Sequence, residues 1–471
     1  MGTISSPGIG SGIDVQSIVK QLVALEKAPL TQLETKANAI KTKISTYGTI
    51  SSQASALGDA AFKLASASGW NAVTASSSNS SAVSVKASAG APVTSLTMEV
   101  SQLAKAQSTA STAVATGAAI GSGSLTIELG SWSAGSFTPG SETPVSVTIN
   151  PGEDTLTEIA AKINDADAGV SAIVLKDASG ERLLMRSKET GTANGFRITA
   201  ADADGNHTDA TGLSRLSFAG GVGSGTTQTQ AAQNALATIN GVSIQTASNT
   251  LNDTLPGLTL QLSQVTTAPV QIDVNTDQDA IRSNVQSFID AYNSLNNTLV
   301  TTTKYDASTK VAGTLQGDST AVGLQNALRG MMQSTSSTSP FSRLSDIGIE
   351  IKTGGTMRLN SEKFNAAMTD LDGLKNLFSA DTGNPATTGF GHKINDFADG
   401  LMEADGMLTN RKNALQKAMD RNGDEQDKVN ERAARAETRY LAMYNAMDAN
   451  VAKLNSLNSF IAQQITLWNR G

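Results

Sequence analysis

The chain has 471 residues and a net charge of −7, from 35 Lys and Arg against 42 Asp and Glu. With no cysteine and only two histidines, His207 and His392, it excludes disulfides, thiolate chemistry and a zinc site built from those ligands. Aromatic residues are 4% of the chain and no basic cluster occurs, so nucleic acids and anionic membranes are poor partners and a structural role is favoured over an enzyme.

The first element is a helical pattern between Ile13 and Tyr47. Ile18, Leu22 and Leu25 recur at helical spacing. Because proline is disfavoured inside a helix, we expect a break or kink near Ala28, ahead of Pro29. A heptad pattern follows the proline, with apolar residues at Leu33, Ala37, Ile40, Ile44 and Tyr47.

From Trp70 to Val274 apolar residues alternate with polar ones, which is typical of strands. The pattern predicts strands at 82–86, 96–100, 125–129, 145–149, 170–175, 181–186, 196–199, 237–239, 242–245, 258–262 and 270–274, with a short helix at 155–164. Asn240-Gly241 predicts a hairpin turn between two of these strands. Two low-complexity stretches, Gln107–Gly123 and Gly220–Gln233, are interpreted as exposed linkers.

Helices return after Val274. Apolar heptad spacing predicts one from Ile281 to Leu299, and further helices are expected at Val322–Met332 and Ser361–Phe378. A hairpin is expected between 349–351 and 357–359, around Gly354-Gly355.

The last segment carries the longest heptad pattern of the chain. Its seam positions are apolar except Asn450 and Gln464, which are polar residues of the kind that fix register or oligomeric state. The pattern exceeds the length of about 3–4 heptads that indicates a coiled coil. The seam consists of Val429, Ala433, Ala436, Tyr440, Met443, Met447, Asn450, Leu454, Leu457, Ile461, Gln464 and Trp468.

This nearly mirror-symmetric order predicts an α+β multidomain fold with nested domains. Residues 1–45 form a coiled-coil helix that pairs with 406–471, and 46–70 with 275–405 form a helical leg domain. Residues 71–120 with 234–274 form an antiparallel β-rich plate domain, into which an outer β-rich domain, 121–233, is inserted. No stretch reaches about 18 consecutive apolar residues and Met1–Ile9 lacks signal-peptide features, so neither a transmembrane helix nor a cleaved signal is expected.

Sites for small-molecule chemistry are weakly indicated. Gly8–Gly12 lacks the spacing of a dinucleotide-binding turn. The acidic residues around Gly205 resemble a calcium loop, but His207 stands where that loop requires glycine, so an exposed turn is favoured. Neither histidine has evident partners for catalysis. We therefore expect no catalytic residue, cofactor or metal.

The C-terminal heptad could pack only on the N-terminal helix of its own chain. However, Leu441, Tyr444, Val451 and Phe460 lie off the seam and widen the apolar face, which favours assembly with further helices. The mixed charges of 421–439 are interpreted as a solvated outer face that could also select partners.

Several motifs together resemble the bacterial flagellar filament-cap family, flagellar hook-associated protein 2. Gly8–Val19 with Glu26–Leu30 is similar to the opening signature of the family, and Arg439–Phe460 is similar to its closing one. Ile239–Val242, Gly257–Leu260, Leu315–Ser319 and Asp346–Ile349 resemble its middle, and Leu125–Thr199 is similar to a module of flagellar hook and filament proteins. The resemblance covers essentially the whole chain.

The resemblance implies a structural cap, not an enzyme, at the distal end of the flagellar filament. Such a protein is secreted unfolded through the export channel, forms a homo-oligomeric ring, usually a pentamer, retains flagellin and promotes its folding and insertion. It also contacts adjacent hook-filament junction proteins, and an export chaperone binds its C-terminal segment. The alternative is a surface adhesin whose β-domains bind host mucin or glycans and whose coiled coil only multimerises.

From the heptads and this resemblance we predict an assembly interface on both terminal helices, with no nucleic-acid partner and no membrane insertion. Its predicted residues are Ile18, Leu22, Leu25, Leu33, Ile40, Ile44, Val429, Ala433, Tyr440, Met443, Met447, Leu454, Leu457 and Ile461.

Overall fold

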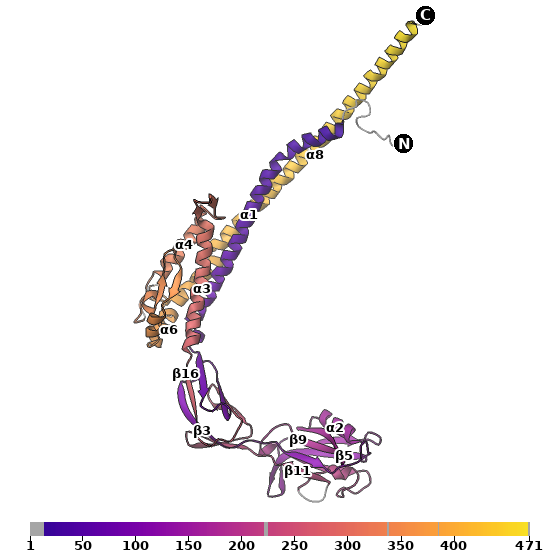
Figure 1. Ribbon diagram of the computed structural model, residues 1–471, viewed down its shortest axis with the longest axis vertical. Helices are drawn as coiled ribbons and strands as arrows, with labels where there is room; N and C mark the ends of the chain where they lie inside the picture. Colours follow the sequence, from indigo (N-terminus) through magenta and orange to yellow (C-terminus); the bar gives the residue numbers. More distant parts are fainter. Residues whose placement is uncertain (1–13, 221–224, 337–338, 385, 470–471) are drawn as a thin grey trace. The chain divides into compact units, whose positions relative to one another are not determined.

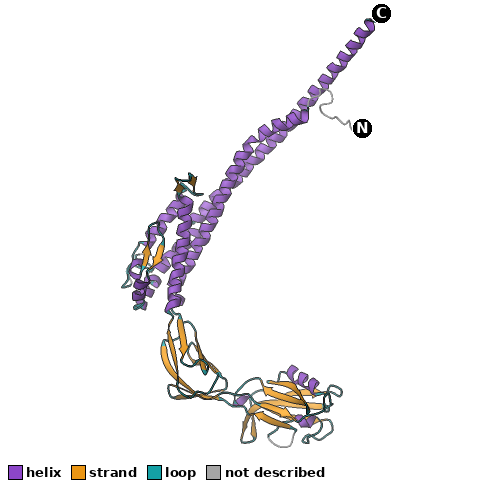
Figure 2. Ribbon diagram, viewed as in Figure 1, coloured by secondary structure: helices purple, strands orange, loops and turns teal. Residues whose placement is uncertain are grey.

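A computed structural model of the chain describes residues 14–220, 225–336, 339–384 and 386–469. The chain divides into two compact units, which are called the helical unit and the strand unit. The helical unit joins the N-terminal part up to Trp70 with everything from Ile281 onwards, and the strand unit comprises Asn71–Ala280. The predicted α+β multidomain class is confirmed (Figure 2).

The helical unit is built around two long helices, α1 and α8, which lie side by side (Figure 1). Fully buried aromatic side chains, among them Tyr47, Phe288, Tyr292, Phe364 and Phe378, fill the core where shorter helices pack on this pair. The helices are α1 (Val15–Ala65), α3 (Gln278–Thr303), α4 (Ser319–Met332), α5 (Ser361–Ala367), α6 (Leu371–Ser379), α7 (Phe390–Met402) and α8 (Met407–Trp468). Two hairpins complete the unit, β17 (Tyr305–Asp306) with β18 (Val311–Ala312), and β19 (Ile349–Ile351) with β20 (Met357–Leu359).

Of the break or kink expected near Ala28, the break is wrong, because α1 continues through Pro29 as one helix. A proline removes one helical hydrogen bond, here to the carbonyl of Leu25. Leu25 is 71% exposed, so water can satisfy that carbonyl, and packing against α8 supports the helix on both sides.

The single helix expected at Ser361–Phe378 is also wrong, since it is two helices. α5 ends at Ala367, and the Asp370 side chain then caps α6 by accepting a hydrogen bond from the backbone N–H of Gly373 at 2.9 Å. An aspartate that caps a new helix offers the backbone an alternative to continuing the old one.

The first strand body contains a five-stranded and a three-stranded antiparallel sheet. Met98, Leu260 and Ile272 lie in the shared hydrophobic cluster between them. The five-stranded sheet has the order β1 (Val73–Ser77), β16 (Val270–Thr276), β3 (Thr94–Gln102), β12 (Ala235–Ile239) and β13 (Val242–Thr246). The three-stranded sheet has the order β14 (Thr250–Leu255), β15 (Leu258–Leu262) and β2 (Val83–Ala87).

The second strand body contains two four-stranded antiparallel sheets and helix α2 (Leu156–Asp165), which packs on β8. Thr155 and Glu158 form a capping box at the start of α2. One sheet has β10 (Gly195–Asp202), β5 (Gly123–Ser133), β6 (Ser136–Pro139) and β7 (Val145–Ile149). The other has β11 (Thr226–Gln230), β4 (Ser108–Ser111), β9 (Gly180–Ser187) and β8 (Val170–Asp177).

The two stretches interpreted as linkers are instead partly strands, because β4 and β11 pair with each other. Gln107 is fully buried, and its side-chain amide donates to the carbonyl of Phe196 at 2.8 Å and accepts from its N–H at 3.0 Å. The hydroxyl of Ser111 accepts a hydrogen bond from the backbone N–H of Leu183 at 2.9 Å. Small polar residues can therefore fill a sheet when their side chains find backbone partners.

The hydrophobic residues of the two strand bodies form separate clusters. One cluster runs from Ala82 to Ala104 and resumes at Ala235, and the other runs from Val114 to Phe218. The finer division into four domains stays a prediction.

Candidate assembly surface

An ion pair between the buried Asp318 and the partly exposed Arg411 ties α1 and α8 to α4. The carboxylate of Asp318 accepts hydrogen bonds from the Tyr47 hydroxyl at 2.7 Å and from Nη2 of Arg411 at 2.6 Å. It also caps α4 by accepting from the backbone N–H of Thr320 at 3.1 Å. Burial by itself would raise the pKa of Asp318, but the hydrogen bonds from Tyr47 and Arg411 outweigh it and lower that pKa. Asp318 therefore stays charged and joins three helices.

Away from this ion pair, α1 and α8 meet along a seam whose buried side chains become smaller or more polar. On α8, Leu408, Leu415 and Asn422 are buried at intervals of one heptad. Beyond them, Ala433 packs in a separate small cluster with three valines of α1. The valines are Val15, Val19 and Val23, and Tyr440, Leu441 and Tyr444 pack against this cluster.

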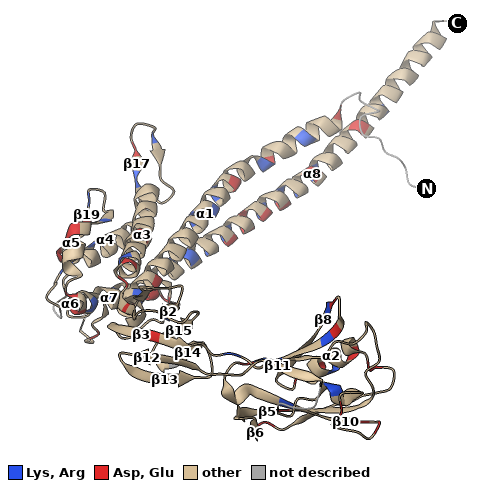
Figure 3. Cartoon of the chain, turned by 60° about the horizontal axis from the view of Figure 1, so that its bottom comes forward, with Lys and Arg blue, Asp and Glu red and all other residues tan. Residues whose placement is uncertain are grey.

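The last part of α8 extends beyond the N-terminal end of α1 (Figure 1). We call residues 445–468 the α8 extension. It bears large exposed apolar side chains, including Trp468 at 89% exposure and Leu454 at 61%. Charged residues are sparse here, with Asp448 and Lys453 alone in 445–468, whereas the preceding part of α8 carries many (Figure 3). The α8 extension thus presents an apolar surface that the described part of the chain leaves uncovered.

The predicted interface residues fall into two groups. On α1, Ile40 is buried and Leu25 is exposed. Partly buried members are Ile18, Leu22, Leu33 and Ile44 on α1 and Val429 and Tyr440 on α8. Ala433 is buried, and the exposed members on α8 are Met443, Met447, Leu454, Leu457 and Ile461. The structure therefore brings the first part of the predicted α8 seam onto α1, and among the described residues the second part stays exposed.

Sequence reasoning missed several of the residues that hold the pair together. Val15, Val19 and Val23 repeat at intervals of four, as Ile18 and Leu22 do, so the sequence offers two neighbouring apolar stripes and spacing alone does not choose between them. The ion pair between Asp318 and Arg411 joins residues far apart in the chain, and no local pattern indicates it.

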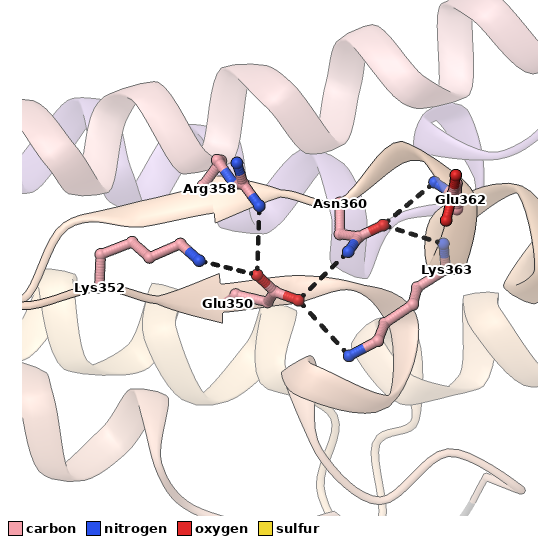
Figure 4. Close-up of polar contacts among 6 residues, drawn as sticks. All are labelled: Glu350, Lys352, Arg358, Asn360, Glu362 and Lys363. Carbon is pink, nitrogen blue, oxygen red and sulfur yellow. Dashed lines mark hydrogen bonds and ion pairs between the residues drawn. The ribbon is translucent and has the colours of Figure 1, made fainter.

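A second polar cluster surrounds Glu350 on the β19–β20 hairpin (Figure 4). Its carboxylate accepts hydrogen bonds from Lys352 at 3.0 Å and Asn360 at 3.3 Å, and it lies 3.4 Å from the Lys363 ammonium and 3.5 Å from Nη2 of Arg358. The hydrogen bonds from Lys352 and Asn360 lower the pKa of Glu350 to about 2. All of these groups are partly or largely exposed, so they stabilise the hairpin without forming an enclosed site.

No described residues assemble a metal site, since nowhere among them do three His, Asp or Glu side chains converge. Nδ1 of His207 accepts a hydrogen bond from the backbone N–H of Asp202 at 3.0 Å, and Asn206 donates its N–H to the Asp204 carboxylate at 2.8 Å, as expected for a turn. Across the described helices, none is both long enough and apolar enough to cross a membrane.

Comparisons with known proteins identify relatives along most of the chain. Residues 11–107 match the family described as flagellar hook-associated protein 2 N-terminus, and residues 232–456 match flagellar hook-associated protein 2 C-terminus. The chain is 30% identical to flagellar hook-associated protein 2 of Escherichia coli over 98% of both chains. It is 28% identical to the B-type protein of Pseudomonas aeruginosa over 94% of both. A crystal structure of the flagellar cap protein FliD from Escherichia coli superposes with a TM-score of 0.63 at 29% identity, covering 79% of this chain and 99% of that one.

Proposed function

This chain belongs to the flagellar hook-associated protein 2 family, and we infer that it is a structural cap at the tip of the bacterial flagellar filament. The family is one of structural proteins and not of enzymes. We propose further that the cap retains arriving flagellin and promotes its folding and insertion.

The observation that supports this proposal is the uncovered apolar face of the α8 extension. Leu454 and Leu457 are 61% and 53% exposed. Burying one such side chain contributes about 1.5–3 kcal/mol, so covering several of them would hold a subunit firmly in an assembly. An exposed apolar face of this kind marks a surface for protein partners.

The same face supports the finer proposals about partners. In the filament it would contact other copies of this chain in a ring, which we propose to be a pentamer, together with hook-filament junction proteins. Before export it would need cover against aggregation, which an export chaperone bound to the C-terminal segment would provide. We propose that the protein is secreted and acts outside the cell. The comparisons name cap proteins and lend no support to the adhesin alternative.

The test is to introduce Leu454→Asp together with Leu457→Asp into cells that depend on this chain for their cap. Two buried aspartates would abolish packing of the α8 extension. We expect the variant to be exported and folded, but flagellin to leak into the medium as monomer. Flagellin in the supernatant is measured by quantitative immunoblotting, and filaments are examined by electron microscopy.

The matched control is Ser456→Asp with Ser459→Asp, which adds the same charge to the opposite face of the same helical turns. The control should form normal filaments. Normal filaments from the leucine variant, or equal leakage from the control, would reject the assignment of this face.

A further inference from the structure

The edge strand β13 of the five-stranded sheet places apolar side chains on the core side of the sheet without covering them. Val242 and Ile244 pair with Ile239 and Ala237 of β12, which are 9% and 4% exposed, so all four point to the same face. Ile244 is only partly buried, and Val242 is 67% exposed. The hydrophobic core therefore continues onto a strand that has no neighbour on its outer side in the described sheet.

Several other edge strands carry features that discourage pairing with a further strand. Charges, prolines and bulges at sheet edges are common protections against such pairing. They include Lys86 on β2, Pro139 on β6, Lys176 and Asp177 on β8, and a register shift between Gln228 and Gln230 on β11. β1 and β7 are uncharged as β13 is, but Val73 of β1 is partly buried, and Val147 and Ile149 of β7 are buried.

β13 has none of these protections. Its residues Val242–Thr246 include no charge, no proline and no register shift against β12. It is therefore an uncharged edge without a register shift, with Val242 exposed and Ile244 partly exposed, which is the form that accepts an added strand.

The turn at Asn240-Gly241 determines which backbone groups of β13 are free. Both residues have positive φ, at 49° and 80°, as in the tight two-residue hairpin turn. In such a hairpin the flanking residues, Ile239 and Val242, form a hydrogen-bonded pair, and the pairs alternate from there. The N–H and C=O groups of Ser243 and Gln245 consequently point away from β12.

The sequence of β13 is complementary to itself about Ile244. In an antiparallel pair of two such strands, Ser243 faces Gln245 and both exchange backbone hydrogen bonds, while Val242 faces Thr246 on the apolar side. Ile244 meets its own counterpart at a non-hydrogen-bonded position, where Cα atoms are about 4.5 Å apart. We propose that a second copy of this chain docks here, joining two five-stranded sheets across a two-fold axis at Ile244.

This contact is distinct from a ring contact. A two-fold interface closes after two copies, so it yields a dimer and leaves the proposed cap function to other surfaces. Its failure would not affect the proposal about the α8 extension, and failure of that proposal would not affect this one.

The absence of cysteine makes a direct test possible in the full-length chain. Ile244→Cys places the thiol on the two-fold axis at a Cα separation within the range of a disulfide, about 4.4–6.8 Å. Mild oxidation should then give a covalent dimer on non-reducing gels, at least tenfold more than Val242→Cys, whose thiol faces Thr246 and not itself. Ile173→Cys, at a residue of β8 that is 62% exposed, controls for random collision.

A second variant keeps the test independent of changes to Ile244. Val242→Cys with Thr246→Cys should restore the covalent cross-link, because each thiol then faces a thiol of the other copy. Gln245→Pro removes the N–H needed between copies and should abolish cross-linking in that double-cysteine background, with circular dichroism confirming the fold. Equal cross-linking at Ile244, Val242 and Ile173, or none at Ile244 and in the double variant, would overturn the proposal.

Discussion

The two ends of the α1–α8 pair are held in different ways. At one end, the buried Tyr47 belongs to a large aromatic core, and its hydroxyl joins the ion pair of Asp318 with Arg411. At the other end, the buried cluster consists of three valines and Ala433, and α8 then continues with an apolar face that no described residue covers. We call these the closed end and the open end.

Between the two ends, a buried seam residue of α8 and an exposed proline of α1 weaken the pair. Asn422 is 1% exposed, and its Nδ2 has no hydrogen-bond partner among the described residues, while Pro29 interrupts the hydrogen bonding of α1. A buried polar group without a partner costs roughly 1–3 kcal/mol. From this difference we infer that stability is graded along one pair of helices, and we predict that the open end separates before the closed end unfolds.

The largest expected effect is at the closed end. Asp318→Ala leaves Arg411 and Tyr47 without their acceptor and removes the cap of α4, so we expect the free energy of unfolding of the helical unit to fall by about 3 kcal/mol. Urea denaturation followed by circular dichroism measures the loss. The control Asp420→Ala, at an exposed position of α8, should change stability by less than about 0.5 kcal/mol. Equal losses in the two variants would show that the ion pair does not distinguish the closed end.

A smaller effect of opposite sign is expected in the middle of the pair. Pro29→Ala restores a hydrogen bond to the carbonyl of Leu25, and a proline in a helix interior costs about 3 kcal/mol or somewhat less at an exposed site. Hydrogen exchange should become slower around Val15–Val23 and stay unchanged around Tyr47. Ala28→Gly, a neighbouring exposed change that lowers helix propensity by about 1 kcal/mol, should shift exchange the other way. Unchanged hydrogen exchange near Val19 would show that Pro29 does not contribute to the gradient of stability along the α1–α8 pair.

Much of the fold follows from local pattern. The strand predicted at 258–262 and the hairpin around Gly354-Gly355 match β15 and β19–β20 residue for residue, because alternation and turn chemistry are local. The helix predictions failed where tertiary contacts override local rules. For example, α1 packs on α8 and continues through Pro29. Asp370 shows the reverse case, a local cap that periodicity alone overlooked.

The assembly surface could be predicted only in part. The heptad from Val429 to Trp468 indicated a long helix with an apolar face, and α8 has one. It could not indicate where the intramolecular partner ends, since that depends on how Val15 of α1 aligns with α8. The ion pair at the closed end was missed because Asp318 and Arg411 are 93 residues apart in the chain. A contact at that separation produces no periodic sequence pattern.

The smallest expected effect concerns acid stability near the closed end, where the β19–β20 hairpin packs through Ile349 and Met357 onto the same core. Glu350 has a pKa lowered from 4.5 to about 2 by hydrogen bonds from Lys352 and Asn360. A carboxyl whose pKa is lower in the folded state stabilises the fold above its unfolded pKa, and this contribution is lost as the pH falls from 4.5 through 2.

Glu350→Gln should therefore be slightly less stable at neutral pH and should lose less stability on acidification than the parent chain. Because the cluster is exposed, the difference in acid-induced stability loss between Glu350→Gln and the parent chain is modest. Thermal unfolding of both proteins across this range measures it, with Glu425→Gln on the exposed face of α8 as the control. Parallel acid profiles for the parent and Glu350→Gln would mean that this cluster contributes nothing to the closed end, leaving its stability to the aromatic core and Asp318.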